Sequence, residues 1–161
     1  MNIAICPGSF DPITKGHMDI INRASKLFDK VVVLVLTNPK KNNTFSMEQR
    51  CELIKKAVGD NPKITVDGYS GLLADYAKSI GATAIVKGLR AMSDFEYEFQ
   101  MALTNKKLNP NLETVFLTSS AENMYLSSSM VRQVAQFGGD ISIFLPEEII
   151  KDVENVLKPK N

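Results

Sequence analysis

The chain has 161 residues, 44% of them hydrophobic and 23% charged, which is ordinary for a globular protein and excludes disordered, collagen-like and coiled-coil classes. Nineteen lysine and arginine residues against 18 aspartate and glutamate residues give a net charge of +1, so no overall field attracts nucleic acid or an anionic membrane. The length predicts one compact domain over residues 1–161. Two isolated cysteines, without a basic leader or a long apolar run, predict a cytoplasmic protein with no export signal and no membrane span.

Five short apolar runs predict β-strands over residues 2–6, 31–36, 64–66, 83–86 and 114–117. These runs are continuous rather than alternating, so the strands have no polar side to turn toward water. Amphipathic segments separate them, which indicates helical crossovers between parallel strands. The sequence therefore predicts an α/β protein with a doubly wound, five-stranded parallel sheet.

The first helix is predicted by apolar residues that recur three and four positions apart after the first strand. They are Ile20, Ile21, Ala24, Leu27 and Phe28. Two later helix starts are predicted by capping-box spacing, Ser46 with Gln49 and Ser93 with Glu96, because each member of such a pair can satisfy a free backbone N–H.

Two further helices complete the pattern. An apolar stripe over residues 72–80 stops at Gly81, a residue suited to a left-handed C-cap. Pro146 is predicted to open a terminal helix that reaches about Leu157. In this architecture ligands bind beyond the carboxyl ends of the strands. The loops expected there are 7–16, 37–45, 67–71, 87–93 and 118–127.

Several common catalytic patterns are missing from the sequence. It contains no GxGxxG and no GxxxxGK[ST], so neither a dinucleotide fingerprint nor a Walker loop is present. One histidine in the chain leaves no HExxH motif and makes His17 the only base for a serine triad. We expect no metal site built from protein side chains, although Mg²⁺ held by substrate phosphates needs almost no protein ligands.

The segment PGSFDPITKGH (7–17) stands directly between the first strand and the first helix. Its glycines and prolines shape a turn that places Gly16 and His17 at the helix N-terminus. Backbone N–H groups and the helix dipole favour a phosphate at that place, and His17 can add a hydrogen bond. The alternative is a histidine that only caps the helix or lies in solvent.

Four cations are expected at the same end of the sheet. Lys40 and Lys41 follow the second strand, and Lys87 and Arg90 follow the fourth. Their convergence in a protein of net charge +1 indicates a polyanionic ligand. For Lys40 and Lys41 the alternative is an ordinary solvated pair in a loop.

Two segments that begin helices have structural explanations as well as functional ones. The three serines at 127–129 are typical of helix caps, and they also offer hydroxyl and N–H groups to phosphate. In the segment 94–102 we expect Phe95, Phe99 and Ala102 to belong to the core or to an interface. Glu98 is expected to be a solvated side chain on the same helix.

The motifs GSFDPITKGH, KGLRAMSDFEYE and SSSMVR occur in the order found in bacterial phosphopantetheine adenylyltransferases, and the chain resembles that family over its whole length. TKGH resembles the [HT]xGH signature of the nucleotidyltransferase superfamily, with Thr14 in the first position. LSSSMVR resembles the second signature, ISSTxxR. The resemblance implies a Rossmann-like nucleotidyltransferase fold.

The resemblance also implies a reaction, in which the adenylyl group of MgATP passes to 4′-phosphopantetheine and gives dephospho-coenzyme A and pyrophosphate. It implies a homohexamer, a dimer of trimers, with feedback binding of coenzyme A and without nucleic acid or membrane partners. The implied ATP-binding residues are Ser9, Phe10, His17, Gly88, Leu89, Arg90, Glu98, Asn123, Met124, Tyr125, Leu126, Ser127, Ser128 and Ser129. The implied phosphopantetheine-binding residues are Ser9, Lys41, Leu73 and Lys87.

The sequence departs from the family pattern in places. Lys87 stands where the family usually has arginine, and Ser9 where many members have threonine. The stretch Asn123-Met124-Tyr125 replaces a tryptophan-containing stretch of some members.

The residues predict direct in-line displacement with no covalent intermediate, because a phosphate monoester is already ionised near pH 7 and needs no general base. We expect His17, Lys41 and Arg90 to be catalytic, with Mg²⁺ bridging phosphate oxygens. The alternatives are adenylyl transfer to nicotinamide mononucleotide, cytidylyl transfer to a small phosphate, or a nucleotide-binding module without turnover.

Overall fold

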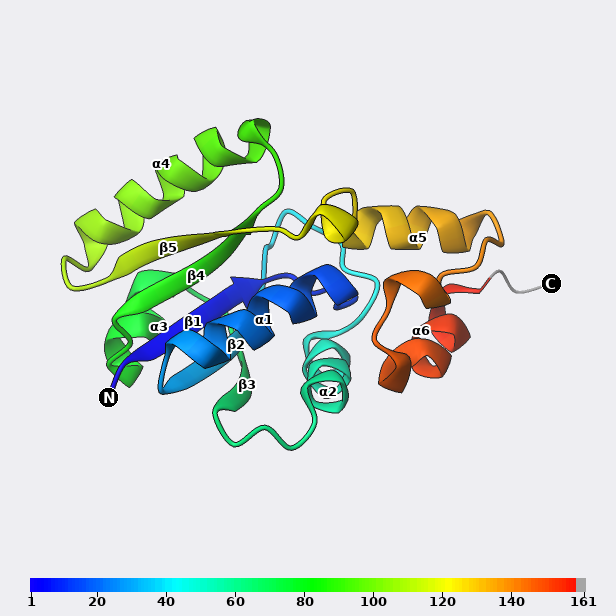
Figure 1. The fold of residues 1–161 in the computed structure, drawn as a ribbon, viewed down its shortest axis with the longest axis horizontal. Helices are drawn as coiled ribbons and strands as arrows, with labels where there is room; N and C mark the ends of the chain where they lie inside the picture. The colour runs from blue at the N-terminus through cyan, green and yellow to red at the C-terminus, as the bar shows by residue number, and fades with distance from the viewer. Residues whose placement is uncertain (159–161) are drawn as a thin grey trace.

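Five parallel strands form the centre of the structure, a computed structural model that describes residues 1–158 (Figure 1). The strands are β1 (Ile3–Gly8), β2 (Lys30–Leu36), β3 (Ile64–Tyr69), β4 (Ala84–Leu89) and β5 (Glu113–Thr118). Their order across the sheet is β3-β2-β1-β4-β5, and every neighbouring pair is parallel. The predicted doubly wound parallel sheet is confirmed. Since strand order reverses beside β1, the carboxyl ends of β1 and β4 define the crevice where this fold binds ligands.

Helices connect and flank these strands. They are α1 (Lys15–Leu27), α2 (Met47–Val58), α3 (Leu73–Ile80), α4 (Met92–Leu108), α5 (Ser128–Gln136) and α6 (Ile150–Leu157), with the 3₁₀ turns η1 (Ala121–Asn123), η2 (Ser142–Phe144) and η3 (Glu147–Ile149). Figure 1 shows α5 and α6 beyond the carboxyl end of β1, on the opposite side of the molecule from the N-terminus. The chain after β5 therefore closes over the end of the sheet where ligands are expected.

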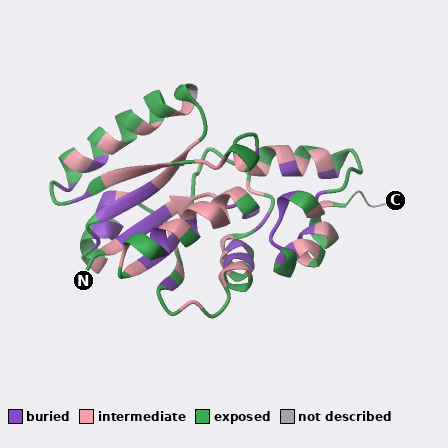
Figure 2. Ribbon diagram, viewed as in Figure 1, coloured by how far each residue is buried: buried purple, intermediate pink, exposed green. Residues whose placement is uncertain are grey.

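Two hydrophobic clusters cover the two faces of the sheet. Along β2, Val31, Val33 and Val35 belong to one cluster, and Val32 and Leu34 belong to the other. Helices α1, α2, α5 and α6 contribute to the first cluster, and α3 contributes to the second. Figure 2 shows the resulting buried strands at the centre of the molecule. Each fully buried side chain of this kind stabilises the fold by about 1.5–3 kcal/mol, which explains the continuous apolar runs in the central strands β1, β2 and β4.

Local signals in the sequence fix several helix ends. The Ser46 side chain accepts from the N–H of Gln49 at 3.1 Å, and the Gln49 side chain accepts from the N–H of Ser46 at 2.9 Å, so the predicted capping box of α2 is confirmed. Gly81 ends α3 with φ 69° and ψ 28°. This left-handed conformation suits glycine because it has no Cβ to clash, and the predicted C-cap is confirmed.

Strands end later than predicted at the carboxyl edge. Lys87, Gly88 and Leu89 were expected in a loop, but they pair in register with Phe116–Thr118 and are the last residues of β4. β1 likewise continues to Gly8 and β3 to Tyr69. Backbone pairing does not require apolar side chains, so glycine and lysine can extend a strand where the sheet borders a cavity.

Two helix starts also differ from the prediction. Helix α4 begins at Met92, with Ala91 as an N-cap that makes no side-chain bond, so the predicted N-cap at Ser93 is wrong. The predicted capping box with Glu96 depends on the Ser93 side chain, which lies outside the described part of the structure. The segment after Pro146 begins as η3 and becomes α6 only at Ile150, because the first turn adopts the tighter 3₁₀ geometry common at helix ends.

The expectation of one domain over residues 1–161 remains a prediction, and residues 159–161 lie outside the described part of the chain. No helix within residues 1–158 combines the length and the apolar character needed to cross a membrane.

Candidate active site

A cavity of about 260 Å³ opens at the carboxyl ends of β1 and β4, where strand order reverses. Its walls come from β1, the turn after it, the first residues of α1, the end of β4 and the start of α5. Ten of the predicted site residues line it: Phe10, His17, Lys87, Gly88, Arg90, Glu98, Asn123, Leu126, Ser127 and Ser128. Segments far apart in the sequence thus meet at the position that the fold reserves for ligands.

His17 lies in the first turn of α1 and is held there by Thr14, the N-cap residue. The Thr14 backbone N–H donates to His17 Nδ1 at 3.0 Å, and the His17 N–H donates to Thr14 Oγ1 at 3.4 Å. These two bonds form a capping box in which histidine replaces the usual Glu or Gln. Since Nδ1 accepts, the proton of the neutral ring is on Nε2, which is the nitrogen free to donate to a ligand.

The surroundings of His17 keep its ring neutral. Burial lowers the pKa of His17 from 6.5 to about 4, and the nearby charges of Arg90 and Lys87 act in the same direction. The ring also meets Phe10 edge-on, with centroids 5.0 Å apart. His17 is thus a fixed, neutral hydrogen-bond donor over the usual pH range, not a cation and not a free base.

Two cations line the cavity with partners that fix their positions. Lys87 Nζ lies 3.5 Å from Glu98 Oε2, with both side chains largely buried. Arg90 donates from Nη1 to the carbonyl of Leu126 at 3.0 Å, and its Nε lies 3.4 Å from Asp94 Oδ2. Ammonium and guanidinium groups carry three and five N–H donors, so each cation retains donors for an anion. The helix pattern alone predicted a solvated Glu98 and the family resemblance placed it in the ATP site; the structure places it in this wall.

The serine segment starts helix α5. Ser127 is the N-cap and accepts from the Met130 N–H at 3.1 Å, which confirms the capping explanation. Ser128 Oγ donates to the carbonyl of Pro12 at 2.6 Å, and Ser129 Oγ accepts from Arg132 at 3.3 Å. With these hydroxyls engaged, the backbone N–H groups of Ser128 and Ser129 are the donors that the start of α5 leaves for a ligand.

Gly88 allows β4 and α1 to approach closely. A Cβ built on Gly88 would lie 2.9 Å from Ile20 Cγ1. A side chain there would push α1, and His17 with it, away from β4. Packing between β4 and α1 is therefore sufficient to explain why residue 88 of the KGLR segment is a glycine.

The other predicted site residues lie outside the cavity lining. They are Ser9, Lys41, Leu73, Leu89, Met124, Tyr125 and Ser129. Lys40 and Lys41 are both exposed in the loop after β2, on the same sheet edge as the cavity but not in its wall. The structure brings Lys87 and Arg90 together as predicted and leaves the lysine pair at a distance from them.

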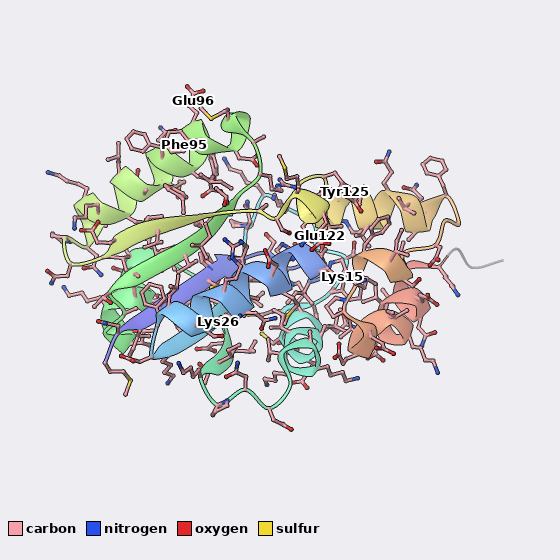
Figure 3. The ribbon with its side chains drawn as sticks, viewed as in Figure 1. Lys15, Lys26, Phe95, Glu96, Glu122 and Tyr125 are labelled. Atoms are coloured by element: carbon pink, nitrogen blue, oxygen red, sulfur yellow. The ribbon has the colours of Figure 1, made fainter. Side chains whose placement is uncertain are left out.

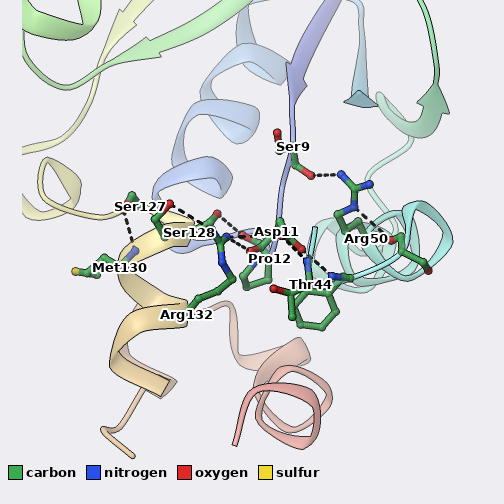
Figure 4. Close-up of polar contacts among 12 residues, drawn as sticks. Ser9, Asp11, Pro12, Thr44, Arg50, Ser127, Ser128, Met130 and Arg132 are labelled. Carbon is green, nitrogen blue, oxygen red and sulfur yellow. Dashed lines mark hydrogen bonds and ion pairs between the residues drawn. The ribbon is translucent and has the colours of Figure 1, made fainter. Parts of the chain in front are cut away.

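Three charged residues near the turn after β1 were not predicted. Arg50 and Arg132 donate to backbone carbonyls of that turn, and the carboxylate of Asp11, within the turn, accepts from backbone N–H groups of the loop after β2, as Figure 4 shows. Arg50 is 2% exposed although it lies in an amphipathic helix. A buried arginine is invisible to helical periodicity, which assigns charged residues to the solvent side. Arg132 could have been noticed because it ends the SSSMVR motif.

The described residues offer no side-chain cage for a metal ion. Within residues 1–158, no three His, Cys, Asp or Glu side chains come together in a way that could hold one. The two cysteines are free, Cys6 buried and Cys51 half-buried. Burial raises the pKa of the Cys6 thiol to about 12, so this thiol in the cavity wall is neutral.

The chain is similar to known nucleotidyltransferases in sequence and in fold. A family model described as Cytidylyltransferase-like matches residues 5–134. A crystal structure of a bifunctional NMN adenylyltransferase/ADP ribose pyrophosphatase from Francisella tularensis superposes with a TM-score of 0.67 at 18% identity, over 89% of this chain and 44% of that longer one. The chain therefore belongs to the cytidylyltransferase-like family and has the fold of that solved nucleotidyltransferase.

Closer relatives define the family. A phosphopantetheine adenylyltransferase of Clostridium tetani is 60% identical over 153 residues, which are 95% of this chain and 96% of the relative. That of Caldanaerobacter subterraneus subsp. tengcongensis is 58% identical over 91% of this chain and 92% of the relative. The chain belongs to the phosphopantetheine adenylyltransferase family. It is a nucleotidyltransferase of coenzyme A biosynthesis, as its resemblance to that family implied.

Proposed function

We propose that this chain transfers the adenylyl group of ATP to the phosphate of 4′-phosphopantetheine, giving dephospho-coenzyme A and pyrophosphate. The observation that carries the proposal is the cavity at the β1 and β4 ends, where neutral His17 stands at the N-terminus of α1 beside Lys87 and Arg90. A helix N-terminus with two cations and an N–H donor favours bound phosphates.

The proposed reaction is a direct displacement at the α-phosphorus of ATP. An oxygen of the acceptor phosphate forms the new P–O bond, and the bond to the β-phosphate bridge breaks, with its electron pair leaving on pyrophosphate. The acceptor is already ionised near pH 7, so no residue has to remove a proton. The protein's task is to align the two substrates and to stabilise charge on the α-phosphate and on pyrophosphate.

Each proposed catalytic residue has one task in this displacement. His17 donates from Nε2 to a non-bridging oxygen of the α-phosphate, a bond that strengthens as charge develops there. Arg90 and the first turn of α5, at Ser128 and Ser129, bind the departing pyrophosphate. Lys41 meets the incoming phosphate in the transition state, and Lys87 binds the acceptor phosphate in the ground state.

The remaining contacts follow from family membership. Ser9, Phe10, Gly88, Leu89, Glu98 and residues 123–129 complete the proposed ATP site. Ser9 and Leu73 complete the proposed phosphopantetheine site. Because Lys41 and Leu73 lie outside the cavity lining, the acceptor is proposed to extend from the cavity toward the loop after β2 and the start of α3.

Mg²⁺ enters this proposal as part of the nucleotide substrate. Its ligands are assigned to phosphate oxygens, since the described residues provide no group of three side chains for it. When bound, the ion neutralises charge on the phosphates. The protein's own contribution is the set of N–H donors and cations already described.

Helix α4 supports the proposal that the enzyme is a homohexamer. Large apolar side chains along it are exposed, among them Tyr97, Phe99, Leu103 and Leu108. Figure 3 marks Phe95 on this helix, and its ring stacks on that of Phe99 with centroids 5.5 Å apart. An apolar surface of this kind is typical of interaction sites. Sedimentation of the purified protein at six times the chain mass would support a hexamer, and a monomer would contradict it.

Two further parts of the proposal concern regulation and location. Coenzyme A contains the product's pantetheine and adenylyl groups, so it is proposed to bind the same site and inhibit by competition. The enzyme is proposed to work in the cytoplasm, where free thiols such as Cys6 and Cys51 persist. An inhibition assay with added coenzyme A tests the first part: a raised KM for phosphopantetheine supports it, and an unchanged rate contradicts it.

A pyrophosphate-release assay tests the proposed reaction. The protein is incubated with ATP or CTP and with phosphopantetheine, nicotinamide mononucleotide or a small phosphorylated alcohol. Release only with ATP and phosphopantetheine is expected. Preference for nicotinamide mononucleotide or for CTP would favour another nucleotidyltransferase. Calorimetric ATP binding without pyrophosphate release would indicate a module without turnover.

A further inference from the structure

The turn between β1 and α1 is held by donors from other parts of the chain at three of its carbonyl oxygens (Figure 4). The pairs are Arg50 Nη1 with Ser9 O (2.8 Å), Arg132 Nη1 with Asp11 O (2.6 Å) and Ser128 Oγ with Pro12 O (2.6 Å). The donors come from α2 and α5, on either side of the turn. The shape of the turn is therefore set by long-range contacts as well as by its own sequence.

The turn needs this support because of Phe10. Its φ is 48°, in the left-handed region that non-glycine residues enter only at a cost of about 1–3 kcal/mol. The Phe10 ring packs against His17. The conformation of the turn thus determines where the proposed donor to the α-phosphate stands.

Asp11 links this turn to a second loop through its side chain. Its carboxylate accepts from the backbone N–H of Thr44 at Oδ2 and from that of Phe45 at Oδ1, both at 2.9 Å. The residue is 4% exposed, and Arg132 Nη1 lies 3.7 Å from Oδ2. A carboxylate this deeply buried is stable only with such partners, and here two N–H groups and a guanidinium provide them.

The linked segment is the loop after β2 that carries Lys41. Its far end, three residues beyond Lys41, is fixed on Asp11, and its near end continues β2. We propose that Asp11 is a positioning residue, which sets the loop carrying Lys41 relative to the turn that leads into α1 and His17. The inference rests on the proposed function, in which Lys41 meets the incoming phosphate. Displacement of a catalytic group by about 1 Å can cost about 100-fold in rate.

Asp11→Asn tests this inference with a small change. An amide has one acceptor oxygen, so one of the two N–H groups of Thr44 and Phe45 then faces an NH₂ donor. The loop should lose one of its two anchors. We expect kcat/KM for phosphopantetheine to fall by about 10- to 100-fold, while the calorimetric Kd for ATP changes less than about threefold. An unchanged kcat/KM, or equal losses for ATP and acceptor, would overturn the inference.

Asp29→Asn is the matched control. Asp29 Oδ2 accepts from the backbone N–H of Asn2 at 2.7 Å, which is the same kind of bond between distant segments, but at the amino end of the sheet. Asp29→Asn should leave kcat/KM for phosphopantetheine and the Kd for ATP at their wild-type values. If Asp29→Asn lowered kcat/KM as much as Asp11→Asn does, the effect of Asp11→Asn would reflect a general loss of stability, and the positioning role would be overturned.

A double variant separates this inference from the proposed function. If Asp11 acts through Lys41, then Asp11→Asn should add little to the loss already caused by Lys41→Ala. Losses that multiply would show that Asp11 acts elsewhere and would overturn the positioning role. A silent Lys41→Ala would instead refute the proposed task of Lys41.

Hydrogen exchange on the unmodified protein gives a test that does not depend on the folding of a variant. The amides of Thr44 and Phe45 should exchange at least about 100-fold more slowly than that of the exposed neighbour Asn42, because their N–H groups are bonded to a buried carboxylate. Equal rates at all three positions would show that the loop is not anchored on Asp11.

Discussion

The backbone N–H of Thr14 donates to Nδ1 of His17 at 3.0 Å, and this bond decides which nitrogen of the ring faces the cavity. With Nδ1 accepting, the neutral ring carries its proton on Nε2. The same contact caps helix α1, so helix stability and tautomer are set together. The proposed donor to the α-phosphate is therefore prepared before any substrate binds.

The free energy of unfolding near pH 5.5 should show whether the folded His17 ring is protonated. The folded ring has a pKa of about 4, below the ordinary value of 6.5, so between these values the unfolded chain binds a proton that the folded chain does not. Stability is therefore lost as pH falls below about 6.5. His17 is the one histidine of the chain, so His17→Gln should remove about 1 kcal/mol of this loss between pH 7.5 and 5.5.

Urea unfolding at the two pH values measures the effect. Equal pH dependence in the wild type and in His17→Gln would show that the folded ring titrates normally. Most carboxyl groups titrate below pH 5.5, so they contribute little to the change in stability between the two pH values.

Alanine substitutions at Lys40 and Lys41 should have clearly different effects on activity. Lys41→Ala is expected to lower kcat/KM for phosphopantetheine by about 10- to 100-fold, since a charge-assisted bond to a phosphate is lost. Lys40→Ala should be nearly silent. Steady-state kinetics with acceptor varied provides the comparison, and reversed effects of the two substitutions would show that the loop is shifted by one residue relative to the family pattern.

Lys87 allows a test of the departure from the family pattern. Lys87→Arg should retain activity and tighten acceptor binding by a few tenths to about 1.5 kcal/mol, because a guanidinium can donate two parallel bonds to phosphate. Lys87→Ala should weaken acceptor binding clearly, while ATP affinity changes much less in both variants. Acceptor KM and calorimetric Kd for ATP are the measurements.

The surroundings of Lys87 define the opposing outcome. Its ammonium group lies 3.5 Å from Glu98 in a partly buried wall, so the bulkier arginine could be excluded and lose activity. An unchanged acceptor KM in Lys87→Ala would show that the phosphate is bound elsewhere.

Much of the fold follows from the order of apolar and amphipathic segments. The central strands β1, β2 and β4 contain continuous apolar runs that are buried on both faces of the sheet, so they stand out in the sequence. Ser46 and Gly81 mark helix ends by local chemistry. The carboxyl ends of the strands were less predictable. Residues such as Lys87 and Gly88 pair through the backbone while bordering a cavity, and periodicity carries no signal for that.

The site could be predicted only where residues are local in sequence. His17 and its turn are recognisable from PGSFDPITKGH, and Lys87 with Arg90 from KGLR. The bonds of Arg50, Asp11 and Arg132 to backbone groups join segments more than 30 residues apart. Such contacts depend on tertiary packing, and a single sequence does not encode them in any local pattern.

The kcat of His17→Ala with ATP and phosphopantetheine tests the account most directly. We expect kcat to fall by about two to three orders of magnitude, with the calorimetric Kd for ATP little changed, because the bond from Nε2 to the α-phosphate strengthens in the transition state. A turnover close to that of the wild type, or a defect entirely in KM, would contradict it.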